Sequence, residues 1–151
     1  MNYYQTDANW ENMPLGNNST IGATGCAFTC ACMCVKKTPK VVHMASSAHR
    51  TEECDWNAIA TFYGKTYENT SNKSYKEMVA LLKAGKPAIV RVAPTSSQHW
   101  VVVYAFDGVD ASPTSANFTC FDPYTHQGHV KLDQALRFNS SGCPYNVLSI
   151  Y

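Results

Sequence analysis

The spacing of apolar residues in this 151-residue chain changes once, after Pro87, and this change limits the folds open to it. Before Pro87 apolar residues recur at helical spacing, whereas after it they form short runs rich in β-branched and aromatic residues. Helices followed by an antiparallel sheet predict an α+β domain. The length fits one domain that covers residues 1–151 and can bury a core of its own.

Three segments of the first half are predicted to be helices: Cys26–Val35, Thr51–Tyr63 and the segment from Ser74 to Gly85. The first is almost entirely apolar or small, is too long for a typical strand, and stops at two lysines and a proline. It is therefore predicted to be buried. The third begins with the capping-box spacing of Ser74 and Glu77.

The second half predicts five strands and one short helix. The strands are expected at Ala88–Ala93, His99–Phe106, Ala116–Phe121, His129–Leu132 and Tyr145–Tyr151. The short helix is expected around Asp133–Phe138, and two polar stretches, 16–20 and 67–73, are expected to be surface loops.

Composition excludes two classes of partner. The net charge of +1 provides no basic field for a phosphate backbone, so we expect no nucleic acid. Apolar runs such as Trp100–Phe106 are far shorter than the roughly 20 residues that a membrane span needs, so we expect no membrane. The first residues lack a secretion signal, which predicts synthesis in the cytoplasm. No cofactor is expected, and the chain is expected to be a monomer.

The seven cysteines include one candidate nucleophile. Four of them crowd into Cys26–Cys34, where a helix would separate their directions, which favours reduced thiols over disulfides. Cys26 opens the predicted helix, and the positive end of a helix favours a thiolate. The dipole effect fades beyond the first turn, so Cys30, Cys32 and Cys34 are expected to be core residues. Helix position alone leaves a packing role for Cys26 equally open, and the spacing disfavours zinc.

A thiol nucleophile needs a base, and His99 is the best candidate of the five histidines because it opens an apolar strand. His126 and His129 flank a predicted turn, while His43 and His49 lie in a polar stretch, so all four are expected at the surface. Asp122 ends a neighbouring predicted strand and can orient the imidazole, although an aspartate before proline also starts turns. Gln5 is a possible oxyanion donor.

Five motifs in this order resemble the bacteriocin-processing-peptidase-like family of papain-like cysteine peptidases. They are Tyr4-Gln5-Thr6-Asp7-Ala8-Asn9-Trp10, Thr20–Thr29, Gly85–Val90, Gln98–Val103 and Phe121-Asp122-Pro123. The resemblance implies a papain-like fold in which helices carry the nucleophile against a C-terminal sheet. It further implies that Cys26 is the nucleophile, His99 the base, Asp122 the orienting residue and Gln5 part of the oxyanion hole.

The expected activity is hydrolysis of a peptide or amide bond through an acyl-enzyme on Cys26. Stand-alone domains similar to this family often degrade cell walls as phage or bacterial lysins, so the expected substrate is the stem peptide of peptidoglycan. A wall-binding domain outside this chain would fit that use. Three alternatives stay open: a leader-processing or intracellular protease, an acyl transferase of the transglutaminase type, and a catalytically silent binding module.

Overall fold

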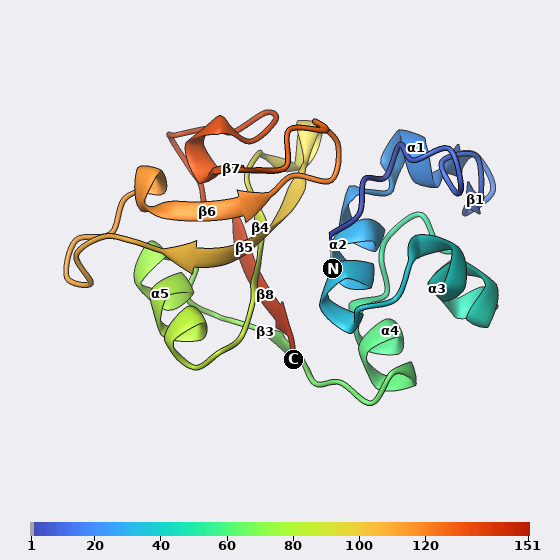
Figure 1. Cartoon of the computed structure of the whole chain (residues 1–151), viewed down its shortest axis with the longest axis horizontal. Helices are drawn as coiled ribbons and strands as arrows, with labels where there is room; N and C mark the ends of the chain where they lie inside the picture. The colour runs from blue at the N-terminus through green and yellow to red at the C-terminus, as the bar shows by residue number, and fades with distance from the viewer. Residues whose placement is uncertain (1) are drawn as a thin grey trace.

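A computed structural model describes residues 2–151, so Met1, where the predicted domain starts, lies outside the described residues. Helices α1 to α4 gather on one side of the molecule, and an antiparallel sheet with helix α5 forms the other side (Figure 1). The predicted α+β class with a papain-like arrangement is confirmed. Within residues 2–151, no helix combines the length and the apolar character needed to cross a membrane.

The helices are α1 (Ile21–Thr24), α2 (Cys26–Val35), α3 (Pro39–Ala45), α4 (Trp56–Phe62) and α5 (Tyr75–Lys83). The predicted bounds of α2 are confirmed. The helix predicted from Thr51 begins only at Trp56, because the Asp55 side chain accepts the N–H of Ala58 at 3.0 Å and caps it there. Ser74 caps α5 in the same way, since its hydroxyl accepts the N–H of Glu77 at 3.1 Å.

Six strands form the main sheet in the order β3-β8-β4-β5-β6-β7, and all their pairings are antiparallel. Their bounds are β3 (Tyr67–Asn69), β4 (Ala88–Arg91), β5 (Trp100–Phe106), β6 (Phe118–Phe121), β7 (His129–Lys131) and β8 (Asn146–Ile150). A separate hairpin pairs β1 (Pro14–Leu15) with β2 (Ser19–Thr20). Four 3₁₀ turns complete the chain: η1 (Ser47–His49), η2 (Thr95–Ser97), η3 (Ser115–Asn117) and η4 (Leu132–Gln134).

Three sequence predictions about loops and turns were wrong. Residues 67–69 form edge strand β3 rather than a loop, because they pair with residues 148–150 of the last strand, β8. Ser19 and Thr20 form β2 for a similar reason, through pairing with Leu15 and Pro14. The helix expected at Asp133–Phe138 is replaced by the single turn η4, and Arg137 then turns the backbone into the left-handed region at φ 59°.

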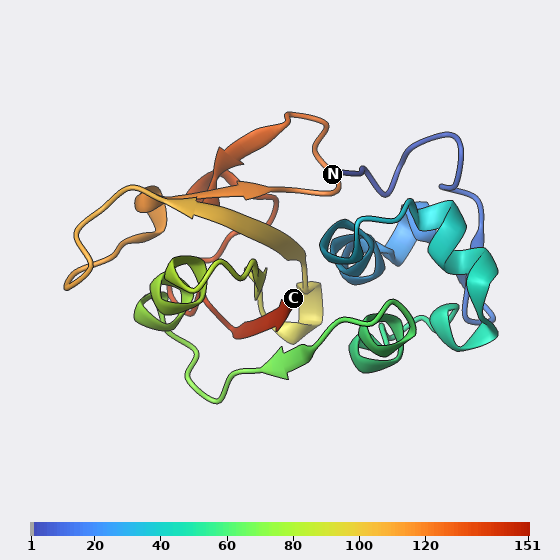
Figure 2. The ribbon, with the colours of Figure 1, turned by 60° about the horizontal axis from the view of Figure 1, so that its bottom comes forward.

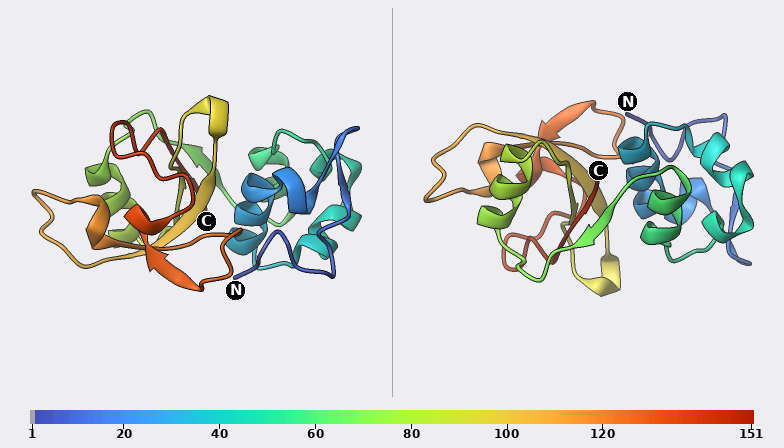
Figure 3. Two further views of the ribbon diagram at one scale, coloured as in Figure 1. Left: turned by 90° about the horizontal axis from the view of Figure 1, so that it is seen from above. Right: turned by 90° about the horizontal axis from the view of Figure 1, so that it is seen from below.

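The central strands are buried on both faces, which explains their unbroken apolar runs. Ile89 and Val102 pack on one face with the residues of α2, whereas Val90 and Val101 pack on the other face with α5. Figures 2 and 3 show the sheet between α5 on one side and the helices around α2 on the other. Alternation along the strands therefore divides the apolar side chains between two cores and fixes α2 against the sheet.

Candidate active site

Cys26 is the first residue of the ten-residue helix α2 and is half-buried. Gly25 precedes it in a tight turn, where its N–H bonds to the Ile21 carbonyl at 2.8 Å. A Cβ on residue 25 would lie 2.3 Å from that same carbonyl oxygen, so only glycine fits there. The turn thus places the thiol where the first N–H groups of α2 have no partner within the helix.

His99 and Asp122 form a buried pair beside Cys26. The pairing of Val102 with Phe121 joins β5 to β6 and brings together the start of one strand and the end of the other. His99 Nε2 lies 2.8 Å from Asp122 Oδ1, and the two side chains are 3% and 0% exposed. Cys26 and His99 line the same cavity, and the interaction with Cys26 contributes to the raised pKa of His99. The structure thus brings together three of the four predicted site residues, with His99 bonded to Asp122 and lining one cavity with Cys26.

The pair has a defined charge state. Burial alone would lower the pKa of His99, but the hydrogen bonds with Asp122 and Cys26 and the charges of both raise it to about 9. Burial alone would raise the pKa of the Asp122 carboxyl, but the contact with His99 and two backbone N–H donors outweigh it and lower that pKa. At neutral pH the imidazole is therefore protonated beside a carboxylate.

Both carboxylate oxygens of Asp122 also accept hydrogen bonds from backbone N–H groups. Oδ1 accepts the N–H of Tyr124 at 2.9 Å, and Oδ2 accepts the N–H of Leu136 at 2.8 Å. Three hydrogen bonds thus fix the Asp122 carboxylate, and the one to Leu136 anchors the backbone next to Arg137.

Gln5, the fourth predicted site residue, is 2% exposed and lines the same cavity as Cys26 and His99. Its Nε2 donates one hydrogen bond to the Gly22 carbonyl at 3.1 Å, which leaves the second N–H of that amide for a ligand. Its backbone N–H bonds to the Pro123 carbonyl at 2.8 Å, so the N-terminal segment is attached beside Asp122. Gln5 therefore lies beside Cys26 and His99, and one N–H of its side-chain amide is available to a ligand.

Cys26 lies between two adjoining cavities. One, of about 290 Å³, is lined by Gln5, Ala23, Thr24, Cys26, Gln98, His99, Tyr124, Leu136 and Arg137. The other, of about 220 Å³, is lined by Thr24, Cys26, Ala27, Glu52, Glu53, Cys54, Trp56, Gln98 and Trp100. We call them the arginine pocket and the glutamate pocket. No local sequence pattern marks Arg137, Glu52 or Glu53 as a site residue, because each lies in a loop whose position depends on distant contacts.

The other cysteines lack the properties of a nucleophile. Among residues 2–151 every cysteine is free, and burial raises the pKa of Cys30, Cys32 and Cys54 well above the ordinary value. Burial also raises the pKa of Cys34 and Cys120 to about 12. The predicted core roles of Cys30, Cys32 and Cys34 agree with their burial.

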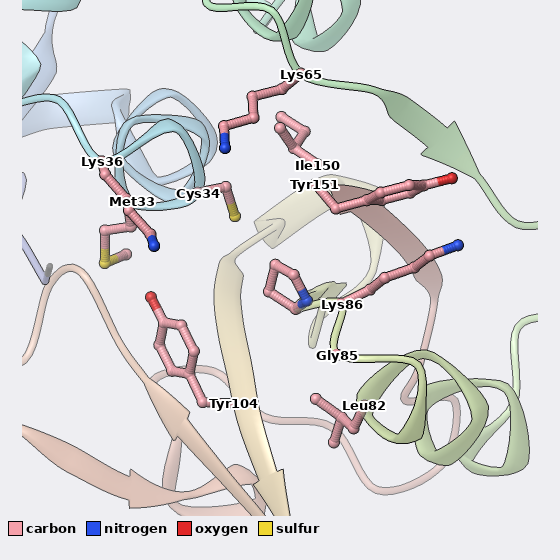
Figure 4. A pocket seen from close by; sticks show the side chains of 11 residues that line it. Met33, Cys34, Lys36, Lys65, Leu82, Gly85, Lys86, Tyr104, Ile150 and Tyr151 are labelled. Carbon is pink, nitrogen blue, oxygen red and sulfur yellow. The ribbon is translucent and has the colours of Figure 1, made fainter.

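A further cavity of about 410 Å³ lies at the far end of α2, where Lys36, Lys65 and Tyr104 surround Cys34 (Figure 4). A β-bulge between Val103 and Ala105 turns Tyr104 out of the sheet toward it. The residues described as lining this cavity include neither a histidine nor a carboxylate side chain. With a protonated thiol and no base, it lacks the groups that nucleophilic catalysis needs.

The remaining histidines divide into two pairs. His126 and His129 are exposed, as predicted. The prediction for His43 and His49 was wrong, because they are 5% and 2% exposed and hold backbone carbonyls inside the helical half. Their bonds to the carbonyls of Pro14 and Val42 explain why histidine is tolerated there. Across the described part of the chain, no group of three or more potential ligands is placed to hold a metal ion.

Comparison with known proteins gives one result. The family model described as "Peptidase_C39 like family" matches residues 2–143, which is nearly the whole chain and includes every residue of the site described above. No curated protein and no solved structure matches the chain.

Proposed function

The chain belongs to the Peptidase_C39-like family of papain-like cysteine peptidases, and from this premise we propose that it hydrolyses an amide in the peptide part of bacterial cell wall. Cysteine peptidase activity follows from the family. The roles of individual residues and the wall substrate are our proposal. The observation that carries it is the bonded pair of His99 and Asp122 beside Cys26, which lines two adjoining cavities.

In the proposed reaction, the Cys26 thiolate attacks the substrate carbonyl and forms a tetrahedral intermediate. The second N–H of Gln5 Nε2 and the backbone N–H of Cys26 stabilise its oxyanion. The His99 imidazolium donates a proton to the leaving nitrogen, the C–N bond breaks, and a thioester remains. Neutral His99 then takes a proton from water, which attacks the thioester and releases the acid and the thiolate.

The wall substrate rests on the likeness to stand-alone lytic domains, and the charge of the chain does not conflict with it. A net charge of +1 neither strongly attracts the protein to an anionic wall nor repels it. The cleft extends on both sides of Cys26, which suits a peptide bond flanked by residues on either side.

The test uses purified sacculi from Gram-positive cells, with turbidity and the masses of released muropeptides as measurements. We expect lysis by the wild type, none by Cys26→Ala, and normal lysis by the control Cys34→Ala, which removes a thiol at the far end of the same helix. Intact sacculi together with cleavage of casein or a double-glycine peptide would refute the wall substrate but not the hydrolase.

The acyl-transfer and binding alternatives have their own readouts. Products that carry an added amine, rather than a new carboxylate, would indicate acyl transfer. A silent module would leave Cys26 no more reactive than Cys30 or Cys54, so preferential iodoacetamide labelling of either of those residues at neutral pH would refute the assignment of the nucleophile.

A further inference from the structure

The two pockets beside Cys26 have opposite charge, and we propose that this polarity selects the substrate. The preferred peptide carries an ammonium group on the residue that becomes the acyl group and a carboxylate on the residue that leaves. The inference rests on the proposed hydrolase and names the chemical class of its substrate.

The arginine pocket is built to receive a carboxylate. Apart from His99, Arg137 is the one ionisable cation among its described lining residues, and no carboxylate of residues 2–151 lies within ion-pair distance of it. Its guanidinium can therefore give its paired N–H groups to a ligand. The backbone at Arg137 adopts φ 59°, a region that residues other than glycine seldom occupy. The bond from Leu136 N–H to Asp122 holds this segment against the catalytic pair.

A second, independent feature of this pocket points to a ligand. Gln5 lines the cavity but is only 2% exposed, and its Oε1 accepts no hydrogen bond from residues 2–151. An unpaired acceptor at a buried site costs free energy unless a donor reaches it. The Gln5 amide therefore has an unused acceptor and an unused N–H beside the pocket where Arg137 would hold the carboxylate.

The glutamate pocket has the opposite character. Glu52 and Glu53 are exposed at its edge, and its apolar wall is formed by Trp56 and Trp100, whose ring centroids lie 5.2 Å apart. The described lining of this pocket contains no cation. An ammonium group there gains attraction from the two carboxylates at the edge of the pocket. A substrate carboxylate would be repelled, which adds discrimination against the reversed peptide.

The position of His99 sets the direction in which the substrate binds. The leaving nitrogen must lie within reach of the imidazole that protonates it. His99 lines the arginine pocket but not the glutamate pocket. The leaving residue therefore occupies the arginine pocket, and the acyl residue lies beside the glutamates. The preferred pair is a residue with a side-chain amine followed by a residue with a carboxylate.

The experiment compares kcat/KM for four quenched fluorescent peptides that differ only in the two residues flanking the scissile amide: Lys–Glu, Gln–Gln, Glu–Lys and Lys–Lys. For the wild type we expect kcat/KM for Lys–Glu to exceed that for Gln–Gln by about tenfold, and Glu–Lys to be the poorest substrate. The factor is small because each charged contact at a partly exposed site contributes only a modest free energy of binding. Arg137→Glu should reverse the preference at the leaving residue, so that Lys–Lys exceeds Lys–Glu. Glu52→Gln with Glu53→Gln should abolish the preference for lysine at the acyl residue.

The control is Lys65→Gln, which removes an exposed cation in the separate cavity of Figure 4 and should leave the order of the peptides unchanged. A merely structural role for Arg137 would lower all four rates together and would not reverse their order. Equal rates for the four peptides, or no cleavage of Lys–Glu, would overturn the inference. If peptides are cleaved without charge preference and the cleavage disappears in Cys26→Ala, the proposed hydrolase stands. If Cys26→Ala cleaves as fast as the wild type, the proposed function itself fails.

Discussion

Replacing Asp122 by asparagine tests how the buried carboxylate controls the charge of His99. Asparagine keeps the size of the side chain and one carbonyl oxygen, but it removes the negative charge 2.8 Å from Nε2. It also turns an amide N–H₂ or a neutral oxygen toward Leu136, whose N–H now bonds to a carboxylate oxygen at 2.8 Å. The substitution therefore removes the charge of the side chain and changes its packing very little.

The expected size of the effect follows from the pKa of His99. Its rise from 6.5 to about 9 corresponds to roughly 3 kcal/mol in favour of the imidazolium. Burial opposes this rise, whereas the bond to Asp122 is the largest contribution that supports it, ahead of the bond to Cys26. Because Cys26 still contributes in Asp122→Asn, we expect the alkaline limb of the pH profile to move down by about one to two pH units.

The assay is the pH dependence of kcat/KM, whose alkaline limb reports the loss of the proton that His99 gives to the leaving nitrogen. In the wild type we expect activity to fall as the pH rises through about 9. NMR titration of His99 should give the same value in each protein. The control Asp107→Asn removes an exposed carboxylate paired with Lys131 and should leave the limb in place. A limb that stays near 9 in Asp122→Asn, with only a reduced kcat, would refute this reasoning.

Stability should follow the same linkage. The pKa of His99 is raised on folding, so its stabilising contribution is complete below pH 6.5 and is lost as the pH rises through about 9. The pKa of Asp122 is lowered, so its contribution is present above pH 3.8 and is lost as the pH falls through the folded value. The free energy of unfolding from urea titrations should therefore differ most between wild type and Asp122→Asn near pH 6, and less above pH 9.

Three further changes give distinct outcomes. Gln5→Ala should lower kcat by roughly 10²–10³ through loss of an oxyanion donor while burst kinetics still show the acyl-enzyme; an unchanged kcat would exclude Gln5 from the oxyanion hole. The double change His126→Ala with His129→Ala should keep full activity, because both rings are exposed outside the two pockets; an inactive double variant beside an active His99→Ala would show that the wrong base was chosen. Gly25→Ala should lower the melting temperature and slow iodoacetamide labelling of Cys26, because the added Cβ meets the Ile21 carbonyl at 2.3 Å; labelling at the wild-type rate would contradict this.

Local sequence patterns predicted those helices and strands that consist of buried apolar residues. The limits of α2 and the approximate positions of β4, β5, β6 and β8 could be read from the sequence because each is an apolar run ended by polar residues, glycine or proline. β3 could not, because its residues are polar and become a strand only by pairing with β8. His43 and His49 were misplaced for a related reason: carbonyls from other segments satisfy their rings and permit burial.

The site was predictable only where chemistry dictates residue type. A thiol at a helix start, an imidazole at a strand start and a carboxylate before proline each carry a local signal, and the family resemblance joined them. The selective part of the cleft has no such signal, since Arg137 enters it through a left-handed turn that Asp122 holds by the N–H of Leu136. In the proposed mechanism, one carboxylate thus orients the base and positions the pocket for the leaving residue. It follows that Asp122→Asn should weaken the preference for a carboxylate in the leaving residue as well as move the pH profile. Peptides compared at a pH where both proteins keep His99 protonated would separate the two effects.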